Sequence, residues 1–145
     1  MTEGSIEILL VEDNPDDVEL ILRALNRHNL ANRVKVVRDG VDALAWLLPE
    51  GPDHDPLDGL PKLVLLDLKL PRIGGLEVLE RIKQSEATRQ IPVVVLTSSR
   101  EERDLVRSYQ IGVNSYIVKP VDFEKFMQSV ADLGMYWLLL NKLPA

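Results

Sequence analysis

The chain of 145 residues contains no cysteine. This absence excludes disulfides, thiolate metal sites and cysteine nucleophiles. Histidine is also scarce: His54 has no second histidine or cysteine at ligand spacing, and we expect His28 to be solvated at the end of a helix. We therefore assign neither histidine a metal role.

Basic residues are too few for a nucleic-acid-binding surface. Lysine and arginine total 17 against 23 acidic residues, which gives a formal net charge of −6, whereas proteins that bind DNA or RNA usually carry a basic stripe. The sequence also lacks an apolar run close to the roughly 20 residues of a membrane span, and its N-terminal residues are not basic. We therefore expect a cytoplasmic protein with no nucleic-acid or membrane partner.

Hydrophobic residues make up 46% of the chain, which excludes a disordered or low-complexity segment. A length of 145 residues corresponds to one domain. We therefore expect a single domain over residues 1–145, with its core at about 6–140 and no separate output module.

Short apolar runs alternate with amphipathic segments along this chain. The predicted strands are 6–11, 34–37, 63–66, 91–96 and 115–118, and the predicted helices are about 15–27, 41–48, 76–82, 101–110 and a last one from Asp122 through Trp137. Four of the five strands are almost entirely apolar, as expected when both faces of a parallel sheet are covered. The pattern predicts an α/β fold, a doubly wound five-stranded parallel sheet with helices on both faces.

Polar side chains follow four of the predicted strands at their carboxyl ends. Glu12 and Asp13 follow the first strand, Asp67 the third, Thr97 the fourth and Lys119 the fifth. Taken singly, each could be a helix cap, a strand-end hydroxyl or a solvated lysine. Because ligands of open α/β sheets bind outside the carboxyl ends of the strands, their coincidence predicts a functional site at this rim.

Three carboxylates at one rim favour a bound cation, because clustered carboxylates otherwise repel one another and raise one another's pKa. Hard oxygen ligands indicate Mg²⁺, which binds through a few carboxylates, water and phosphate. A carboxylate held beside the ion could then act as a nucleophile toward phosphorus and form an acyl phosphate, while Lys119 and Thr97 neutralise charge and donate a hydrogen bond.

Four stretches carry a resemblance to a known family: Val-Glu-Asp at 11–13, Leu-Leu-Asp at 65–67, Leu-Thr-Ser at 96–98 and Tyr-Ile-Val-Lys-Pro at 116–120. Together they resemble the receiver domain of two-component response regulators, over about residues 6–140. The resemblance implies a flavodoxin-like strand order 2-1-3-4-5. It also implies phosphoryl transfer from a sensor histidine kinase, signalling to a downstream protein through protein contacts, and no enzymatic output.

The resemblance also implies a role for each strand-end residue. Asp67 would be the phosphoacceptor, Asp13 a direct Mg²⁺ ligand and Glu12 a ligand acting through water. The backbone carbonyl of Lys69 would be the third protein ligand.

Thr97 and Tyr116 would then form a switch pair, and Lys119 would bind a phosphoryl oxygen. The bond between Lys119 and Pro120 would be cis, as X–Pro bonds can be.

Some features resemble a subgroup, the small receivers paired with phytochrome-type histidine kinases. They are the stretches 11–17, 38–40 and 91–97, the ending Tyr136-Trp137-Leu138, and the long proline-rich loop before the third strand. One position departs from the wider family, because Lys69 stands where a short polar residue is common. We expect its long side chain to lie beside the acyl phosphate and slow its hydrolysis.

Two other functions fit parts of this pattern. An aspartyl-phosphate hydrolase also uses an aspartate after a strand, but it needs a second acid two residues later, where this chain has Lys69. A degenerate receiver would act only as a partner-binding module, which the filled set of strand-end positions disfavours. Incubation with acetyl phosphate and Mg²⁺ separates these alternatives from a phosphoacceptor.

The C-terminal segment predicts a homodimer. Beyond the stripe that would dock the last helix on the sheet, further apolar residues continue around it: Leu133, Met135, Tyr136, Leu138, Leu139 and Leu140. Folding back over the domain's own end is the alternative. We expect a dimer in sedimentation at micromolar concentration that Leu138→Glu with Leu139→Glu converts to monomer; a monomeric wild type, or a dimer unchanged by these substitutions, would refute it.

Overall fold

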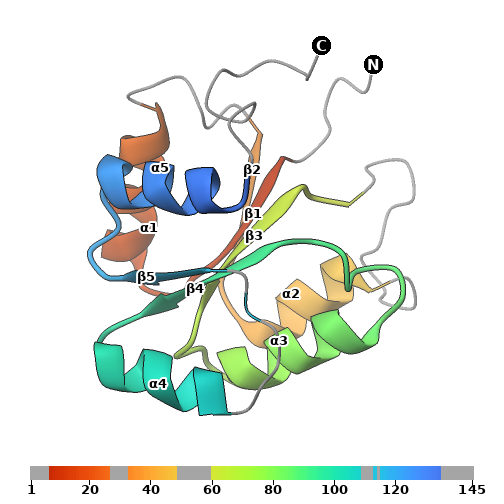
Figure 1. The fold of residues 1–145 in the computed structure, drawn as a ribbon. Coiled ribbons are helices and arrows are strands. Elements are labelled where there is room, and N and C mark those ends of the chain that lie inside the picture. The colour runs from red at the N-terminus through yellow and green to blue at the C-terminus, as the bar shows by residue number, and fades with distance from the viewer. Residues whose placement is uncertain (1–6, 27–32, 49–59, 109–112, 114, 135–145) are drawn as a thin grey trace.

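The computed structural model describes residues 7–26, 33–48, 60–108, 113 and 115–134, and these form an alternating series of strands and helices (Figure 1). The strands are β1 (Ile8–Val11), β2 (Val34–Val37), β3 (Leu63–Asp67), β4 (Val93–Thr97) and β5 (Ser115–Val118). The helices are α1 (Pro15–Asn26), α2 (Gly40–Leu47), α3 (Gly75–Gln84), α4 (Arg100–Ser108) and α5 (Phe123–Asp132). The predicted alternation of strands and helices is therefore confirmed.

The strands form one parallel sheet in the order β2-β1-β3-β4-β5, which confirms the predicted doubly wound topology. In register, Val11 lies opposite Leu66 of β3, and Asp67 lies opposite Leu96 of β4. The carboxyl ends of β1, β3 and β4 therefore lie together at one edge, where strand order reverses between β1 and β3.

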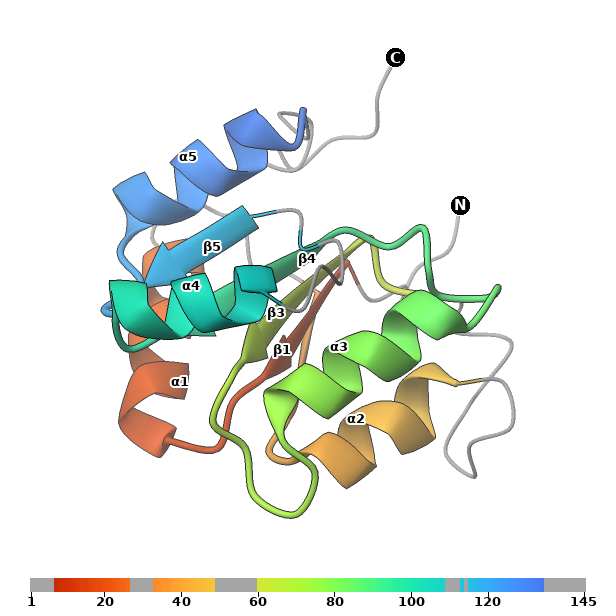
Figure 2. The ribbon, with the colours of Figure 1, turned by 60° about the horizontal axis from the view of Figure 1, so that its bottom comes forward.

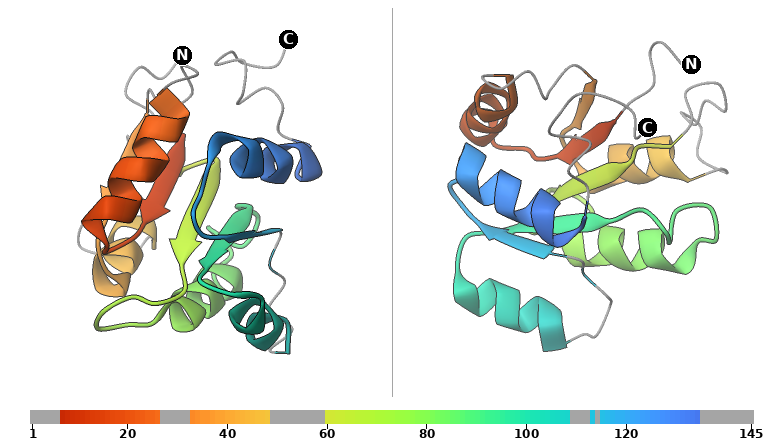
Figure 3. Two further views of the ribbon diagram at one scale, coloured as in Figure 1. Left: turned by 90° about the vertical axis from the view of Figure 1, so that its left-hand side faces the viewer. Right: turned by 45° about the horizontal axis from the view of Figure 1, so that its top comes forward.

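Helices cover both faces of the sheet (Figures 1 and 2). On one face, α1 and α5 bury Val18, Ile21, Leu25, Phe126 and Val130 against Ile8, Leu10, Leu63 and Leu65. On the other face, α2, α3 and α4 bury residues such as Leu44, Leu79 and Val106 against Leu9, Val11, Val64 and Leu66. Because side chains alternate along each strand, the sheet has an apolar core on each face, and Figure 3 shows the helices around the sheet from two further sides.

Local capping explains where several helices begin. Asn14 Oδ1 accepts hydrogen bonds from the backbone N–H groups of Asp16 and Asp17, at 2.8 and 3.2 Å, which caps α1 as the Asn14–Pro15 pair predicts. Asp39 caps α2 and Asp122 caps α5 through the same type of bond, each at 2.8 Å. Each cap satisfies backbone donors that the first helical turn leaves free.

The prediction of one last helix from Asp122 through Trp137 is wrong, because α5 ends at Asp132. Leu133 N–H still bonds to the Ser129 carbonyl, and Gly134 then adopts a φ of 71°, a conformation that ends helices and favours glycine. Trp137, the other dimer residues among 135–140 and most of the proline-rich loop lie outside the described residues. The homodimer therefore stays a prediction.

Small differences at strand ends have local causes. The fourth strand begins at Val93 instead of residue 91, since Pro92 has no N–H to give to the sheet.

Within the described residues, no helix is long and apolar enough to cross a membrane.

Candidate functional site

The alternation of side chains along the strands directs three of the predicted site residues to one face. Glu12 follows β1 on the face of Leu10, Asp67 ends β3 on the face of Leu65, and Lys119 follows β5 on the face of Ile117. This is the face covered by α1 and α5. Strand register and side-chain alternation therefore bring together residues that are distant in sequence.

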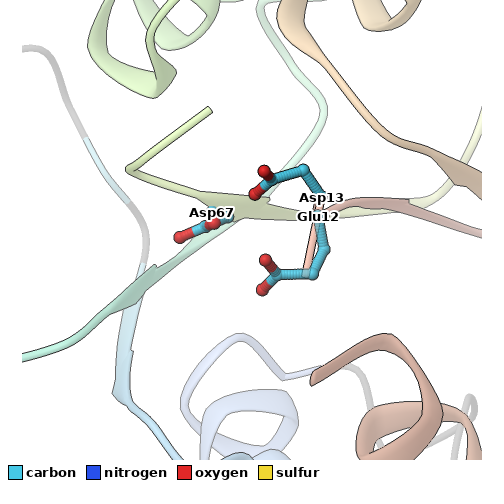
Figure 4. Close-up of side chains that lie close together, drawn as sticks. All are labelled: Glu12, Asp13 and Asp67. Atoms are coloured by element: carbon cyan, nitrogen blue, oxygen red, sulfur yellow. The ribbon is translucent and has the colours of Figure 1, made fainter. Parts of the chain in front are cut away.

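Three carboxylates gather at the carboxyl ends of β1 and β3. One oxygen from each of Glu12, Asp13 and Asp67 lies within 4.8 Å of the others. Figure 4 shows the Glu12 and Asp13 carboxylates on opposite sides of their chain, both turned toward Asp67. Glu12 is fully buried and Asp67 nearly so, whereas Asp13 is exposed. This donor set fits a small hard cation reached from the solvent on the Asp13 side.

The ammonium of Lys119 balances part of this negative charge. Its Nζ lies 2.8 Å from Glu12 Oε1 and 3.4 Å from Asp67 Oδ1. A third carboxylate approaches from the first turn of α1, where Asp17 Oδ2 accepts a hydrogen bond from Nζ at 3.0 Å. Asp17 could not be recognised as a site residue from the sequence, because an acid in the first turn of a helix is common for the helix dipole alone.

The crowding of carboxylates shifts the proton affinities at the site. Burial is the main cause that raises the pKa of Glu12 to about 7; hydrogen bonding and charge repulsion from Asp67 add to it, and the Lys119 ammonium offsets it only in part. Burial lowers the pKa of Lys119, but its hydrogen bonds to Glu12 and Asp17 outweigh that effect and raise this pKa above its usual value. Lys119 is therefore charged at neutral pH. Glu12 takes up a proton near neutral pH when no cation is bound.

Glu12 should make the metal-free protein lose stability as the pH rises. Its carboxyl titrates at 4.5 when unperturbed and at about 7 in the fold, so the folded protein binds more protons between these values and its free energy of unfolding falls as the pH rises through them. Urea unfolding without metal should show Glu12→Gln gaining about 1–3 kcal/mol on wild type between about pH 5 and pH 8.

The matched control for this experiment is Glu77→Gln, which removes an exposed carboxylate from the first turn of α3. Its stability should stay parallel to that of the wild type across the same pH range. A Glu12→Gln protein that also stays parallel to wild type would contradict the raised pKa.

Thr97 ends β4 with a buried hydroxyl that has no hydrogen-bond partner among the described residues. The preceding residue of β4, Leu96, pairs with Asp67 of β3. Thr97 therefore lies one residue further along β4 than the residue opposite Asp67. A buried hydroxyl without a partner is costly, and a functional role is one explanation for such a group. The predicted switch residue is thus placed to donate a hydrogen bond to a newly arrived acceptor.

Tyr116 lies on the same face of the sheet as Thr97. It pairs in register with Val95, and it packs, half-buried, against the core of α2, α3 and α4. Thr97 and Tyr116 are therefore diagonal neighbours on adjacent strands, which is within reach of an aromatic side chain. The two predicted switch residues thus lie on one face of adjacent strands, and their role as a pair stays a prediction.

Lys69 occupies a loop that begins directly after Asp67. Its backbone N–H donates a hydrogen bond to Asp67 Oδ1 at 3.3 Å. Its exposed ammonium, however, lies 3.2 Å from Glu102 Oε2 on α4, and Glu102 also accepts hydrogen bonds from the Ser98 N–H and hydroxyl. In the structure this ammonium therefore lies at Glu102 instead of beside Asp67, where it was expected.

The loop between β3 and α3 is held at both ends. A Cβ at Gly75 would overlap the Asp67 carbonyl oxygen, and the Gly75 N–H bonds to the Leu68 carbonyl at 3.0 Å. Arg72, at a φ of 66°, forms an ion pair with Asp39 at the start of α2.

The predicted cis bond between Lys119 and Pro120, directly after β5, is also present.

Comparison with known proteins agrees with this geometry. A model of the response regulator receiver domain matches residues 8–131. The chain is 48% identical over 143 residues to the probable methanogenesis regulatory protein FilR2 of Methanothrix harundinacea, covering 98% of this chain and 90% of that protein. It is 39% identical over 139 residues to the response regulator Rcp1 of Synechocystis, covering 95% and 92%.

Solved structures give the same result. The bacteriophytochrome response regulator RtBRR superposes with a TM-score of 0.85 at 53% identity, over 97% of this chain and 84% of that one. The Mn(2+)-bound form of Rcp1 superposes with a TM-score of 0.73 at 38% identity, over 97% and 99%. The chain therefore belongs to the response regulator receiver domain family, close to Rcp1 and the bacteriophytochrome response regulators.

Proposed function

We propose that this chain is a response regulator that accepts a phosphoryl group on Asp67 from a sensor histidine kinase, with Mg²⁺ bound, and signals through protein contacts. The observation that carries the proposal is the placement of Asp67. Its carboxylate lies with Glu12 and Asp13 on one side and the Lys119 ammonium 3.4 Å away. A nucleophile, a cation site and a fixed positive charge thus meet at one point.

In the transfer step, an Asp67 carboxylate oxygen would attack the phosphorus of a phosphohistidine. A P–O bond forms as the P–N bond breaks, and the departing imidazole keeps the electron pair and takes up a proton. Lys119 would bind one of the phosphoryl oxygens, and the Thr97 hydroxyl, buried without a partner, would donate to another. Phosphoryl transfer needs mainly such positioning and charge neutralisation.

The residues present fit Mg²⁺, because three carboxylate oxygens within 4.8 Å of one another repel unless a cation neutralises them. Asp13 and Asp67 would bind the ion directly, Glu12 through water, and the Lys69 backbone carbonyl would complete the protein ligands. When bound, Mg²⁺ supplies charge neutralisation for the carboxylates and the phosphoryl oxygens. The Mn(2+)-bound form of Rcp1, a similar protein, supports the binding of a divalent ion.

The donor kinase is proposed to be of the phytochrome type. The support is the similarity to RtBRR at 53% identity and to the phytochrome response regulator RcpA at 40% identity. Receiver activity on Asp67 does not depend on this assignment, because a small phosphodonor can replace the kinase.

Incubation with acetyl phosphate tests the proposed function. We expect the intact mass to increase by a single phosphoryl group when Mg²⁺ is present and to stay unchanged in excess chelator, because the carboxylates then repel the anionic donor. Addition of Mg²⁺ after the chelator should restore labelling. Equal labelling with and without chelator would contradict the metal dependence, and no labelling with Mg²⁺ bound would favour a module that only binds partners.

A further inference from the structure

Asp17 in the first turn of α1 contacts the same ammonium that the proposed phosphoryl group would use. Its Oδ2 accepts a hydrogen bond from Lys119 Nζ at 3.0 Å, across 102 residues of sequence. The carboxylate oxygens that cluster closely enough for a metal ion come from Glu12, Asp13 and Asp67, and Asp17 is not one of that group. Its contact with Lys119 therefore needs an explanation of its own.

Carboxylates surround the Lys119 ammonium, and the one from Asp17 accepts a hydrogen bond from it. An ammonium has three donors, and three carboxylates lie around this one, from Glu12 at 2.8 Å, Asp17 at 3.0 Å and Asp67 at 3.4 Å. A phosphoryl oxygen that approaches Lys119 therefore meets an ammonium that already donates a hydrogen bond to Asp17. The arrangement therefore makes the incoming phosphoryl group compete with a carboxylate of the chain.

Asp17 is the carboxylate most easily displaced. The Asp17 side chain is 28% exposed, against 0% for Glu12 and 6% for Asp67, so its carboxylate can be resolvated by water. Asp67 is the proposed phosphoacceptor itself. Glu12 is fully buried in the acidic cluster, where water cannot replace its contact with Lys119. Without Asp17, Lys119 would still be held by these two neighbours.

We propose that Asp17 holds Lys119 in the unphosphorylated state and competes with the phosphoryl group for its ammonium, which makes Asp17 a positioning residue that slows phosphorylation. The inference rests on the proposed function of Asp67. It also gives phosphorylation a direct route to α1, because Asp17 releases Lys119 when the phosphoryl oxygen takes its place.

The test compares second-order rates of labelling by acetyl phosphate at saturating Mg²⁺. Asp17→Asn should be labelled roughly three- to tenfold faster than wild type, as expected for the loss of one partly exposed competing charge. Asp17→Glu keeps the charge and should restore the wild-type rate to within about twofold. A purely structural role for Asp17 would slow labelling in Asp17→Asn or leave it unchanged.

Asp16→Asn is the matched control. It removes an exposed carboxylate from the same turn of α1, where Asp16 and Asp17 both bond through their backbone N–H groups to Asn14. It should label within about twofold of the wild type, because long-range repulsion of the donor is screened by salt.

The outcomes separate this inference from the proposed function. Unlabelled wild type would contradict the proposed function and the inference together. Labelled wild type with Asp17→Asn no faster than Asp16→Asn would overturn the role of Asp17 alone. Asp17→Glu as fast as Asp17→Asn would also overturn it, because a retained carboxylate should still compete.

Discussion

Replacement of Asp67 by asparagine is expected to abolish labelling by acetyl phosphate. The amide is a far weaker nucleophile than the carboxylate, and it removes one of the oxygens that cluster with Glu12 and Asp13. The fold should be retained, because Asp67 raises the pKa of Glu12 and its removal relieves that repulsion. Intact-mass spectrometry in the presence of Mg²⁺ should show no added phosphoryl group.

Asp16→Asn controls for the loss of one negative charge and should be labelled like the wild type, because Asp16 is exposed on α1. A phosphorylated Asp67→Asn protein would mean that another residue accepts the phosphoryl group. That result would leave the acidic cluster without its proposed nucleophile.

Loss of the Thr97 hydroxyl is expected to separate phosphorylation from the conformational response. Thr97→Ala should still be labelled, because the nucleophile and the acidic cluster remain. The hydrogen bond that would couple residue 97, and through it Tyr116, to the phosphoryl group would be missing, so phosphorylation would no longer shift the equilibrium between the two states. Tyrosine ring resonances in NMR, recorded with and without the acyl-phosphate mimic beryllofluoride, should move in wild type and stay almost unchanged in Thr97→Ala.

Thr97→Ser is the matched control, since it keeps a hydroxyl at the end of β4 and should respond like wild type. The stability of Thr97→Ala should change by less than about 1 kcal/mol, because removal of a buried hydroxyl that has no partner within the described residues offsets the loss of the buried γ-methyl group. If Thr97→Ala showed the full tyrosine response on beryllofluoride binding, the proposed coupling would be wrong.

Much of the fold could be predicted because local and global signals agree. Apolar runs such as 63–66 identify buried strands, and Asn14 with Pro15 marks a helix start that the structure confirms by two hydrogen bonds. The end of α5 could not be predicted in this way. Apolar residues continue past Asp132 in the sequence, whereas Gly134 at a φ of 71° ends the helix. Hydrophobic pattern alone does not mark helix termini.

The main site residues could be predicted because they share one structural property, their position at the ends of parallel strands. Glu12, Asp67 and Lys119 are brought together by topology, which an alternating sequence specifies well. Their proposed roles in phosphoryl transfer came from the resemblance to receiver domains and from general chemistry.

The contacts of long side chains could not be predicted. Asp17 looks like an ordinary first-turn acid, and only the packing of α1 against the sheet places it 3.0 Å from Lys119. The Lys69 ammonium could reach several acids, and the position of α4 directs it to Glu102. Such contacts depend on how helices dock, which neither periodicity nor spacing along the chain specifies.

Chemical mapping of the modified residue tests the central claim most directly. Borohydride reduces an aspartyl phosphate to homoserine, so protein treated with acetyl phosphate and Mg²⁺, reduced and digested should yield homoserine at position 67. The same treatment without phosphodonor should leave Asp67 intact. Homoserine at position 67 is the result that the proposed mechanism predicts; homoserine at Asp13 or another acid, with Asp67 unmodified, would contradict it.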